Sequence, residues 1–286
     1  MFSRQFEYLA PTSLDDALSA LASTPGAKIM SGGQSLIPLM KLRLFSPGTV
    51  VDIGRIDGLG DIVERDDHIS IGALVRHNQT ASDPLVAEHA TALGQAAAWT
   101  GDHQVRNRGT TCGAMAHADI AADQPAAAIA LGATMVARSS SGEREIPAQE
   151  FFVDALTSAL SDDEILVELR VPTSTNGSTS AYDKLGRRGG HTDYAVAGVA
   201  VWVQVTDGSV SDARIGVTGV GTRPSLAEAA ASALIGTDGN DEAITDAAAL
   251  VTDGITVIED LYGSVEYKTH LAKVFTERAL RQALAG

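Results

Sequence analysis

Cysteine is the scarcest functional residue of this 286-residue chain, which contains only Cys112. One thiol excludes an internal disulfide. It also excludes an iron–sulfur cluster with four cysteine ligands, or a cysteine-rich zinc site, built by this chain alone. Any such centre that serves the protein must lie on another polypeptide.

Positive charge is scarce as well. Lys and Arg number 21 against 36 Asp and Glu, which gives a formal net charge of −15. So acidic a surface repels phosphate backbones and anionic lipid headgroups, and we expect no nucleic-acid partner and no membrane insertion. No apolar run approaches the length of a transmembrane helix, and the first residues do not form a secretion signal. We therefore expect a cytoplasmic protein.

Several familiar catalytic patterns do not occur. The sequence has no Walker A loop, no G-x-S-x-G elbow and no H-E-x-x-H motif. Gly216–Gly221 is rich in glycine, but the order of its glycines is not that of the dinucleotide fingerprint, and we interpret it as a structural turn. The chain also offers no convincing acid–base or nucleophile set.

Hydrophobic periodicity predicts mixed helix and strand throughout. The first segment, Phe6 to Ile53, is expected to contain a helix that Ser13 caps, a strand over Ala27–Met30, a helix over Leu36–Leu44 and a strand over Thr49–Ile53. The second segment, Ile62 to Pro172, is expected to contain strands at His68–Ile71, Ala133–Arg138, Glu143–Ile146 and Glu164–Val171, and helices at Leu85–Trp99 and Gln124–Leu131. Ser139–Gly142 can connect the second and third of these strands as a hairpin.

A polar stretch separates these segments from the last one. Pro172–Ser180 is rich in Ser, Thr, Asn and Gly and has no apolar period, which favours a linker. Beyond it, strands are expected at Ala195–Val205 and Ser209–Thr218. Alanine-rich helices at Ser225–Leu234, Asp241–Val251 and Tyr267–Leu284 would cover one face of that sheet.

Two glycine-bearing turns are the most informative features. The first, SGGQS at Ser31–Ser35, follows a strand and precedes a helix. Glycines let the main chain approach a ligand closely, and a helix that starts near Ser35 would point its positive end at a phosphate. A tight strand-to-helix turn without any ligand is the alternative.

The second turn lies within RNRGTTCGAMAHAD, Arg106–Asp119. Thr110 and Thr111 place hydroxyl groups beside the main-chain N–H donors of Cys112, Gly113 and Ala114. Together, the two turns could clamp the two phosphates of a dinucleotide from opposite sides.

Acidic residues follow the second turn. Asp119 and Asp123 are four residues apart, one helical turn, so both could face the same ligand. Carboxylates suit the hydroxyl groups of a ribose or ribityl chain, whereas they are poor neighbours for phosphate. A helix N-cap is the alternative role for Asp119.

Other roles for these residues stay open from the residues alone. His117, Asp119 and Asp123 are residue types that a metal accepts, although no further His or Cys cluster is near. Cys112 could act as a nucleophile beside His103 or His117, or could be a small residue that fits its turn. Arg106 and Arg108 could pair with phosphate, with acids of a partner, or with solvent.

Four blocks of sequence, in order, resemble one family. They are AKIMSGGQSLIPLMKLR (Ala27–Arg43), QVRNRGTTCGAMAHADIAAD (Gln104–Asp123), DEILVELRVP (Asp163–Pro172) and YDKLGRRGGHTDYA (Tyr182–Ala195). Together they are similar to the FAD-binding medium subunit of the molybdenum hydroxylases, the family of the xanthine, carbon monoxide and nicotine dehydrogenase flavoproteins. The resemblance covers nearly the whole chain.

This resemblance implies an α+β architecture of three parts. Two FAD-binding subdomains, residues 1–56 and 57–174, would form a two-subdomain fold of the vanillyl-alcohol oxidase type. A C-terminal α+β domain, residues 180–286, would follow with its sheet covered by helices.

The resemblance also implies the residues that bind FAD. The first diphosphate loop would be Ile29, Met30, Ser31, Gly32, Gly33, Gln34, Ser35 and Leu36, and the second would be Thr110, Thr111, Cys112, Gly113 and Ala114. Near them lie His117 and Asp119. Asp123 matches the acid that binds the sugar-alcohol chain, Leu166 and Lys184 match residues beside the isoalloxazine ring, and Tyr194 is the candidate aromatic near that ring.

The second loop departs from the family's Thr-Ile-Gly-Gly pattern at one position. Cys112 stands where the first glycine is usual, which places a Cβ where the main chain is expected to approach the cofactor closely. The loop tolerates this residue if Cys112 has a negative φ.

Partners follow from the same resemblance, because this chain lacks the cysteines for an electron relay. It implies a small subunit with two [2Fe–2S] clusters and a large molybdopterin-binding subunit, with FAD on this chain. We expect an oxidoreductase subunit that passes electrons to an external acceptor, in a heterotrimer. A nucleotide-binding assembly or regulatory module without redox turnover, and a stand-alone flavin reductase of the same superfold, are the alternatives.

Overall fold

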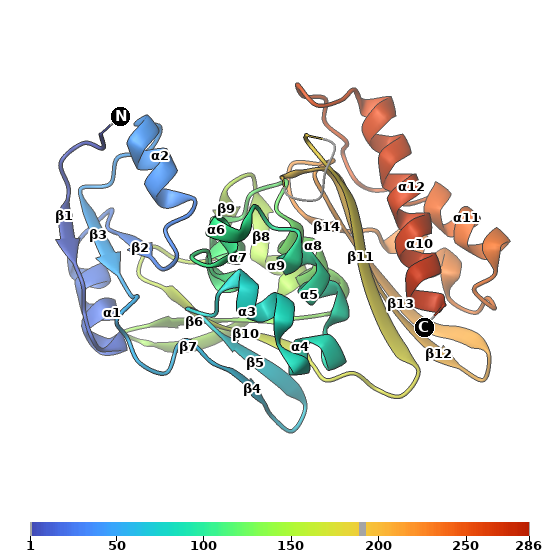
Figure 1. Ribbon diagram of the computed structural model, residues 1–286, viewed down its shortest axis with the longest axis horizontal. Helices are drawn as coiled ribbons and strands as arrows, with labels where there is room; N and C mark the ends of the chain where they lie inside the picture. Colours follow the sequence, from blue (N-terminus) through green and yellow to red (C-terminus); the bar gives the residue numbers. More distant parts are fainter. Residues whose placement is uncertain (1, 189–192, 286) are drawn as a thin grey trace.

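A computed structural model describes residues 2–188 and 193–285 of the chain. Figure 1 shows the three larger sheets in a row, with helices between and around them, and a fourth sheet has only the two strands β8 and β9. Part of the fourth block of the family resemblance, Gly189–Thr192, lies outside the described residues.

The N-terminal segment is a small parallel sheet with a helix on its face. Its strands are paired in the order β1-β3-β2. Helix α1 buries Ala17, Leu18 and Leu21, and the Ser13 hydroxyl caps its N-terminus, as the sequence predicts. The bounds are β1 Glu7–Leu9, α1 Leu14–Ser23, β2 Lys28–Met30, α2 Leu36–Leu42 and β3 Thr49–Asp52.

The middle segment is a five-stranded antiparallel sheet in the order β4-β5-β10-β6-β7, with short helices on one face (Figure 1). The hairpin predicted at Ser139–Gly142 is confirmed, since these two residues pair at its tip. The bounds are β4 Ile62–Glu64, β5 His68–Gly72, α3 His77–Ser82, α4 Pro84–His89, α5 Thr91–Ala98, α6 His103–Arg106, α7 Thr111–His117, α8 Asp123–Ala130, β6 Thr134–Ser139, β7 Gly142–Pro147, α9 Ala148–Phe151, β8 Phe152–Asp154, β9 Thr157–Ser158 and β10 Ile165–Pro172.

The C-terminal segment is a four-stranded antiparallel sheet in the order β11-β12-β13-β14. Helices α10 to α12 cover one of its faces (Figure 1), and α5 and α8 contact the other. The bounds are β11 Ser178–Gly186, β12 Ala195–Thr206, β13 Ser209–Thr218, β14 Ser225–Leu226, α10 Glu228–Leu234, α11 Asp241–Ala249 and α12 Val265–Leu284.

Helix α8 lies at the centre of the molecule. All eight of its residues are buried, because α5, β12 and β13 all pack around it. The middle and C-terminal segments therefore meet across α8, together with α5.

The structure differs from the sequence prediction in several places. Ser225 and Leu226, predicted to begin a helix, form the short strand β14, and α10 begins only at Glu228. The helix predicted at Leu85–Trp99 is two helices, because Ala90 leaves the helical conformation (φ −143°) and the Ser180 hydroxyl accepts the N–H of Ala92. The predicted linker is also shorter than expected, since β11 already begins at Ser178 and pairs with β12.

Candidate functional site

The two glycine turns meet in space. The hydroxyl groups of Ser31 and Thr110 lie 2.8 Å apart and share a hydrogen bond, although 79 residues separate them. A Cβ at Gly32 would lie 2.3 Å from the Arg108 carbonyl oxygen and 2.7 Å from Cα of Gly109. Glycine at position 32 is therefore what allows the two main chains to touch.

The first turn connects the end of β2 to the start of α2. Gly33 has a left-handed φ of 72°, which favours glycine. Within residues 2–188 and 193–285, the main-chain N–H groups of Gly32, Gly33 and Gln34 donate to no other group of the chain. Such neighbouring free N–H groups are suited to binding an anion.

The second turn follows α6 and leads into α7. The Thr110 hydroxyl caps α7 by accepting the N–H of Gly113 at 3.2 Å. A Cβ at Gly113 would lie 2.5 Å from that hydroxyl and 2.9 Å from the Ser31 hydroxyl. Both turns thus bring bare backbone and small hydroxyl side chains to one place.

Two groups beside the second turn fix its backbone, and the sequence analysis missed both. The N–H of His77 donates to Gly109 O at 3.0 Å, and the guanidinium of Arg76 donates to Arg108 O. The ring of His77 packs against Gly109 and accepts a hydrogen bond from Gln124 at 2.8 Å. Burial and the nearby guanidinium groups lower the pKa of His77 to about 4, so it is neutral near pH 7. No local pattern marks Arg76 or His77, because only pairing with the second turn gives them this position.

Cys112 lies inside α7 and points away from the turn. Its side chain is buried in the core, and its thiol donates to the Ile71 carbonyl oxygen at 3.5 Å. Burial raises the pKa of this thiol to about 12, and a buried, protonated thiol is a poor nucleophile, which favours the alternative that Cys112 is a small residue that fits its position. Because the residue is helical and its Cβ faces the core, the departure from glycine leaves the turn open.

The two arginines that flank the second turn differ. Arg106 is buried and donates to the carbonyl oxygens of Thr100 and Gly101, the latter at 2.6 Å, so its head group is used inside the protein. Arg108 is exposed. Of the two arginines that flank the turn, only Arg108 has a side chain free to reach a ligand.

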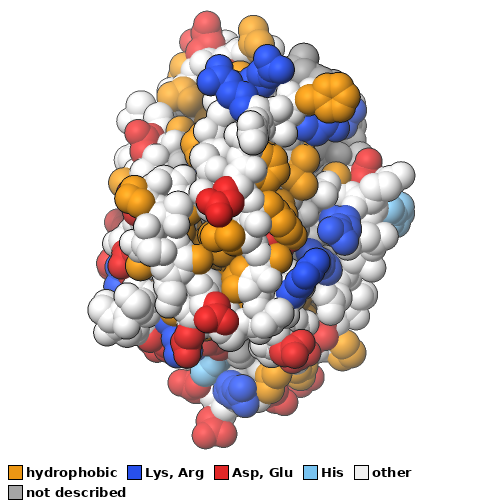
Figure 2. All heavy atoms as spheres, turned by 90° about the vertical axis from the view of Figure 1, so that its left-hand side faces the viewer, with side chains coloured by type: hydrophobic (Ala, Val, Ile, Leu, Met, Phe, Trp, Pro, Cys, Tyr) orange, Lys and Arg blue, Asp and Glu red, His pale blue; other side chains and the backbone are white. Residues whose placement is uncertain are grey.

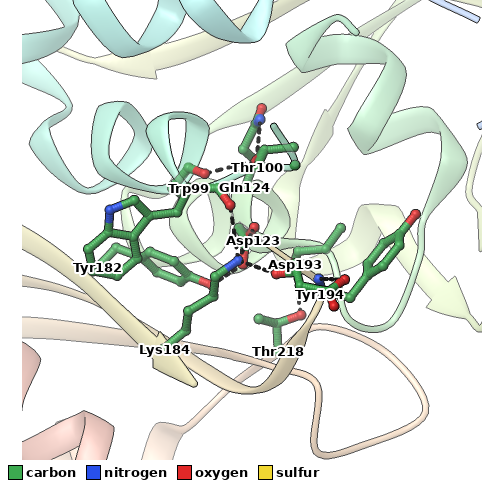
Figure 3. Close-up of polar contacts among 12 residues, drawn as sticks. Trp99, Thr100, Asp123, Gln124, Tyr182, Lys184, Asp193, Tyr194 and Thr218 are labelled. Atoms are coloured by element: carbon green, nitrogen blue, oxygen red, sulfur yellow. Dashed lines mark hydrogen bonds and ion pairs between the residues drawn. The ribbon is translucent and has the colours of Figure 1, made fainter. Parts of the chain in front are cut away.

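A buried ionic cluster lies at the start of α8, around Asp123 (Figure 3). The carboxylate of Asp123 accepts from the Tyr182 hydroxyl at 2.6 Å and from the Lys184 ammonium at 2.7 Å. Lys184 donates further to the carbonyl oxygens of Trp99, at 3.2 Å, and Asp193, at 2.5 Å. Asp123 and Lys184 are separate candidates in the sequence, and the structure joins them in one ion pair.

Burial dominates the electrostatics of this cluster. It raises the pKa of Asp123 to about 6, against the opposing effect of the Lys184 ammonium, and it lowers the pKa of Lys184. Each charge is held in place by the other, because an unpaired ion at this depth is strongly unfavourable. Tyr182, in β11, was missed as a partner because its neighbour in space is 59 residues away in the chain.

Asp119 and Asp123 are not on one helical turn, so that expectation is wrong. Helix α7 ends at His117, Ala118 takes the left-handed conformation (φ 50°), and α8 begins only at Asp123. Asp119 is also not a helix N-cap, because its carboxylate accepts the N–H of Ala121 within the connecting turn. Neither aspartate thus has the helical position predicted from spacing.

The β13 residue Thr218 anchors this connecting turn by donating to the carbonyl oxygens of Ile120 and Ala122 at 2.9 and 2.8 Å. His117 is partly buried, which lowers its pKa. Among the described residues, no group of three or more His, Cys, Asp or Glu side chains could hold a metal ion. His117, Asp119 and Asp123 therefore do not form the alternative metal site.

The remaining predicted residues have contrasting surroundings. Leu166 is buried in the core on β10. Tyr194 is 42 % exposed, and the guanidinium of Arg187 lies 5.1 Å from its ring centroid and 4.3 Å from that of Tyr262.

A hollow of about 920 Å³ lies elsewhere, lined by charged side chains of β4, β5 and β10 and by neither turn. No helix within the described residues is long and apolar enough to cross a membrane.

Comparison with known proteins identifies the family. Residues 4–174 match the family described as FAD binding domain in molybdopterin dehydrogenase, and residues 180–283 match the CO dehydrogenase flavoprotein C-terminal domain. The chain is 38 % identical over 281 residues to the 6-hydroxypseudooxynicotine dehydrogenase complex subunit alpha of Paenarthrobacter nicotinovorans, which covers 98 % of this chain and 94 % of that protein. It is also 38 % identical over 286 residues to the carbon monoxide dehydrogenase medium chain of Hydrogenophaga pseudoflava. That match covers 100 % of this chain and 99 % of that protein.

Solved structures agree with these matches. A carbon monoxide dehydrogenase structure from Hydrogenophaga pseudoflava superposes with a TM-score of 0.95 at 40 % identity, covering 100 % of this chain and 99 % of that one. Quinoline 2-oxidoreductase from Pseudomonas putida 86 gives a TM-score of 0.93 at 34 % identity, with the same coverage. The predicted α+β flavoprotein fold and the family resemblance are confirmed. The chain belongs to the family of FAD-binding medium subunits of the molybdenum hydroxylases.

Proposed function

We propose that this oxidoreductase subunit holds FAD with its diphosphate between the two glycine turns. In this proposal it takes electrons from the [2Fe–2S] clusters of a small partner subunit and passes them to an external acceptor. A large molybdopterin-binding subunit completes the complex. The observation that carries the proposal is the contact between the turns, Ser31 to Thr110 and Gly32 to Arg108.

The residues present fit a diphosphate. Beyond the free N–H groups of the first turn, those of Thr110 and Cys112 in the second also donate to no other group within the described parts of the chain. Neither Ser31–Leu36 nor Thr110–Ala114 contains an acid, although the chain as a whole is strongly acidic. Neutral donors that converge from two sides suit a dianionic group in such a protein.

The proposed roles of the other residues follow from their positions. Asp123 is the proposed partner of the sugar-alcohol chain, and each of its oxygens keeps a lone pair beyond its bond to Tyr182 or Lys184. Lys184 and Leu166 are proposed to support the side of the ring, and Tyr194 to lie near it. We propose the division into residues 1–56, 57–174 and 180–286, supported by the separate sheets of these segments.

The flavin itself supplies the redox chemistry, since it can accept electrons singly and release them in pairs. This chain binds and orients it, with a neutral His77 ring against Gly109 and the Cys112 thiol buried in the core. With one cysteine, the chain cannot ligate a [2Fe–2S] cluster alone, which supports a partner for that role. We also propose a cytoplasmic location, supported by the acidic surface and the single free thiol.

Spectroscopy and electron transfer test this proposal together. The purified chain should be yellow, contain about one FAD per protein, and be reduced by the dithionite-reduced [2Fe–2S] subunit. Folded, colourless protein that takes up no added FAD would contradict the binding role. FAD-loaded protein that exchanges electrons with no partner or acceptor would favour a non-redox module, and a chain that purifies alone from its native extract would favour a stand-alone reductase.

A further inference from the structure

Arg76, the residue before α3, lies opposite the second glycine turn. Residues 75–77 run antiparallel to residues 109–111, and two main-chain hydrogen bonds of 3.0 Å flank the pair formed by Arg76 and Thr110. Directly opposed residues of such a pair place their side chains on one face. On that face the Thr110 hydroxyl bonds the Ser31 hydroxyl of the first turn at 2.8 Å. The Arg76 side chain therefore starts where the two turns meet.

The head group of Arg76 holds the point of contact between the turns. It donates a hydrogen bond to the Arg108 carbonyl oxygen. That oxygen is also the atom nearest to the position of a Cβ on Gly32, so it lies against the first turn. The main chain of Arg76 is itself fixed, because its N–H donates to the Gln79 side chain at 2.8 Å. Loss of the guanidinium would therefore release the part of the second turn that touches Gly32.

Arg76 and Arg108 bring two positive charges to one place. Burial and the neighbouring Arg108 guanidinium lower the pKa of Arg76, and Asp52 opposes them. The Asp52 carboxylate already accepts from the Tyr8 hydroxyl, at 2.6 Å, and from the Gly54 N–H, at 2.8 Å. Within residues 2–188 and 193–285, no carboxylate forms an ion pair with either arginine. Two like charges without a counter-ion repel each other, and a bound anion would relieve that repulsion.

Positive charge is local in this molecule. The net charge of the chain is −15, yet Lys and Arg side chains gather on the upper and right-hand parts of the face that carries the N-terminal segment (Figure 2). Acidic side chains gather toward the lower end of the same face. The main-chain donors of the glycine turns are neutral, whereas a diphosphate carries two negative charges. Side chains must balance those charges, and Arg108 belongs to the second turn while Arg76 is bonded to it.

From these contacts we propose that Arg76 is a positioning residue of the diphosphate site. It holds the Arg108 carbonyl against Gly32. Its remaining N–H groups, together with the Arg108 guanidinium, supply the positive charge that the neutral donors of the turns lack. An arginine has five N–H donors and keeps its charge, so one donor can hold a carbonyl while others remain for a phosphate oxygen. This inference rests on the proposed function and adds a side chain to a site otherwise made of main chain and small hydroxyls.

The test measures the affinity of the full, FAD-depleted chain for FAD by flavin fluorescence, and for ADP by competition with FAD. ADP carries the diphosphate without the flavin ring. Arg76→Gln should weaken both affinities by roughly 10- to 100-fold, the size expected when a hydrogen bond to a charged group is lost. Arg108→Gln, a change at an exposed residue, should weaken both by a smaller factor and leave thermal stability unchanged.

Salt and a conservative variant separate charge from positioning. The FAD affinity of the wild type should fall more steeply with added NaCl than that of Arg76→Gln, because screening acts on a charge that the variant lacks. Arg76→Lys should keep the wild-type salt dependence and still bind FAD more weakly. Its ammonium lacks the planar fork of donors that reaches the Arg108 carbonyl and a phosphate together. Equal salt dependence of Arg76→Gln and the wild type would contradict the role in charge.

Arg65→Gln is the matched control. It removes the same charge at the hollow lined by β4, β5 and β10, which neither turn lines, and should leave both affinities unchanged. Wild-type affinity of folded Arg76→Gln for FAD would overturn the inference. A loss no larger than that of Arg65→Gln, or a loss for FAD without one for ADP, would overturn it too.

Arg108→Gln covers the case in which Arg76→Gln does not fold, since unchanged ADP affinity of that variant would also overturn the inference. Failure of the wild-type chain to bind FAD, or of ADP to compete with it, would instead overturn the proposed function.

Discussion

The two sides of the site are built by opposite means. On one side, the glycine turns offer main-chain N–H groups and small hydroxyls, and neither Ser31–Leu36 nor Thr110–Ala114 contains an ionisable side chain other than the buried Cys112 thiol. On the other, the cluster around Asp123 consists of buried charges that satisfy one another. The turns depend on space that any Cβ would fill, whereas the cluster depends on charge balance and burial. Steric changes should therefore damage the first side and charge changes the second.

The largest effect is expected in the charged cluster. Lys184→Met leaves the Asp123 carboxylate buried without its cation and should lower the free energy of unfolding by about 3–5 kcal/mol at pH 7. Without Lys184, the raised pKa of Asp123 rises further, so Asp123 takes up a proton on folding. The deficit should shrink as the pH falls below that pKa, as urea unfolding at pH 7 and pH 5 would reveal.

The control for this change is the double variant Lys184→Met with Asp123→Leu, which removes both charges. It should recover part of the lost stability, because no ion remains unpaired. A double variant that is less stable than Lys184→Met would contradict charge balance as the cause.

The second largest effect is expected from a steric change in the first glycine turn. Gly32→Ala places a methyl group against the Arg108 carbonyl, and the strain of about 1–3 kcal/mol must separate the turns. We expect the FAD content of the purified protein to fall about tenfold or more, measured by the ratio of flavin to protein absorbance. Gly48→Ala is the control, since nothing lies within 4 Å of a Cβ there. Equal FAD content in the two variants would refute the steric explanation.

The pH dependence of the free energy of unfolding should reveal the contribution of His77, which packs against the second turn at Gly109. The folded protein lowers the pKa of His77 to about 4 from its ordinary 6.5, so the unfolded chain takes up the proton first as the pH falls. The stability that His77 contributes is therefore complete above pH 6.5 and is lost between pH 6.5 and 4. At pH 5 the loss should be about 2 kcal/mol.

His77→Asn removes this titration, so its free energy of unfolding should fall less between pH 7 and pH 5 than that of the wild type. Other groups, including Asp123, titrate in both proteins and cancel in the comparison. Identical pH dependence in the two proteins would show that His77 is not held neutral by its surroundings.

The smallest effect is expected at Cys112. Cys112→Ala should destabilise the fold by about 1 kcal/mol through lost packing, with no change in FAD content, because the side chain faces the core and not the turn. The wild-type thiol should also resist alkylation by iodoacetamide at pH 8, as its raised pKa implies. Rapid alkylation of folded protein would contradict this placement.

Local sequence was sufficient for the features that are local in origin. The helix from Leu14, the strand before Gly32 and the hairpin at Ser139 all follow from capping, periodicity and turn residues. That the two turns come together was inferred from glycine chemistry and the family resemblance.

Features that arise from tertiary contact could not be predicted in this way. The bond between Asp123 and Lys184 joins residues 61 positions apart, and the break at Ala90 depends on a hydroxyl from β11. The direction of the Cys112 side chain depends on how α7 packs on the core, near Ile71. The spacing of Asp119 and Asp123 was misleading, because a left-handed Ala118 ends one helix before the next begins.

The central position of α8 has a consequence for any attempt to shorten the protein. A fragment that stops before β11 would expose the apolar side of α8 and strip Asp123 of both Tyr182 and Lys184. The glycine turns would then lie beside a helix that has one apolar face exposed to water and a carboxylate, Asp123, without its cation. The cofactor half of this molecule is thus not a detachable module, and its last hundred residues serve as a wall of the site.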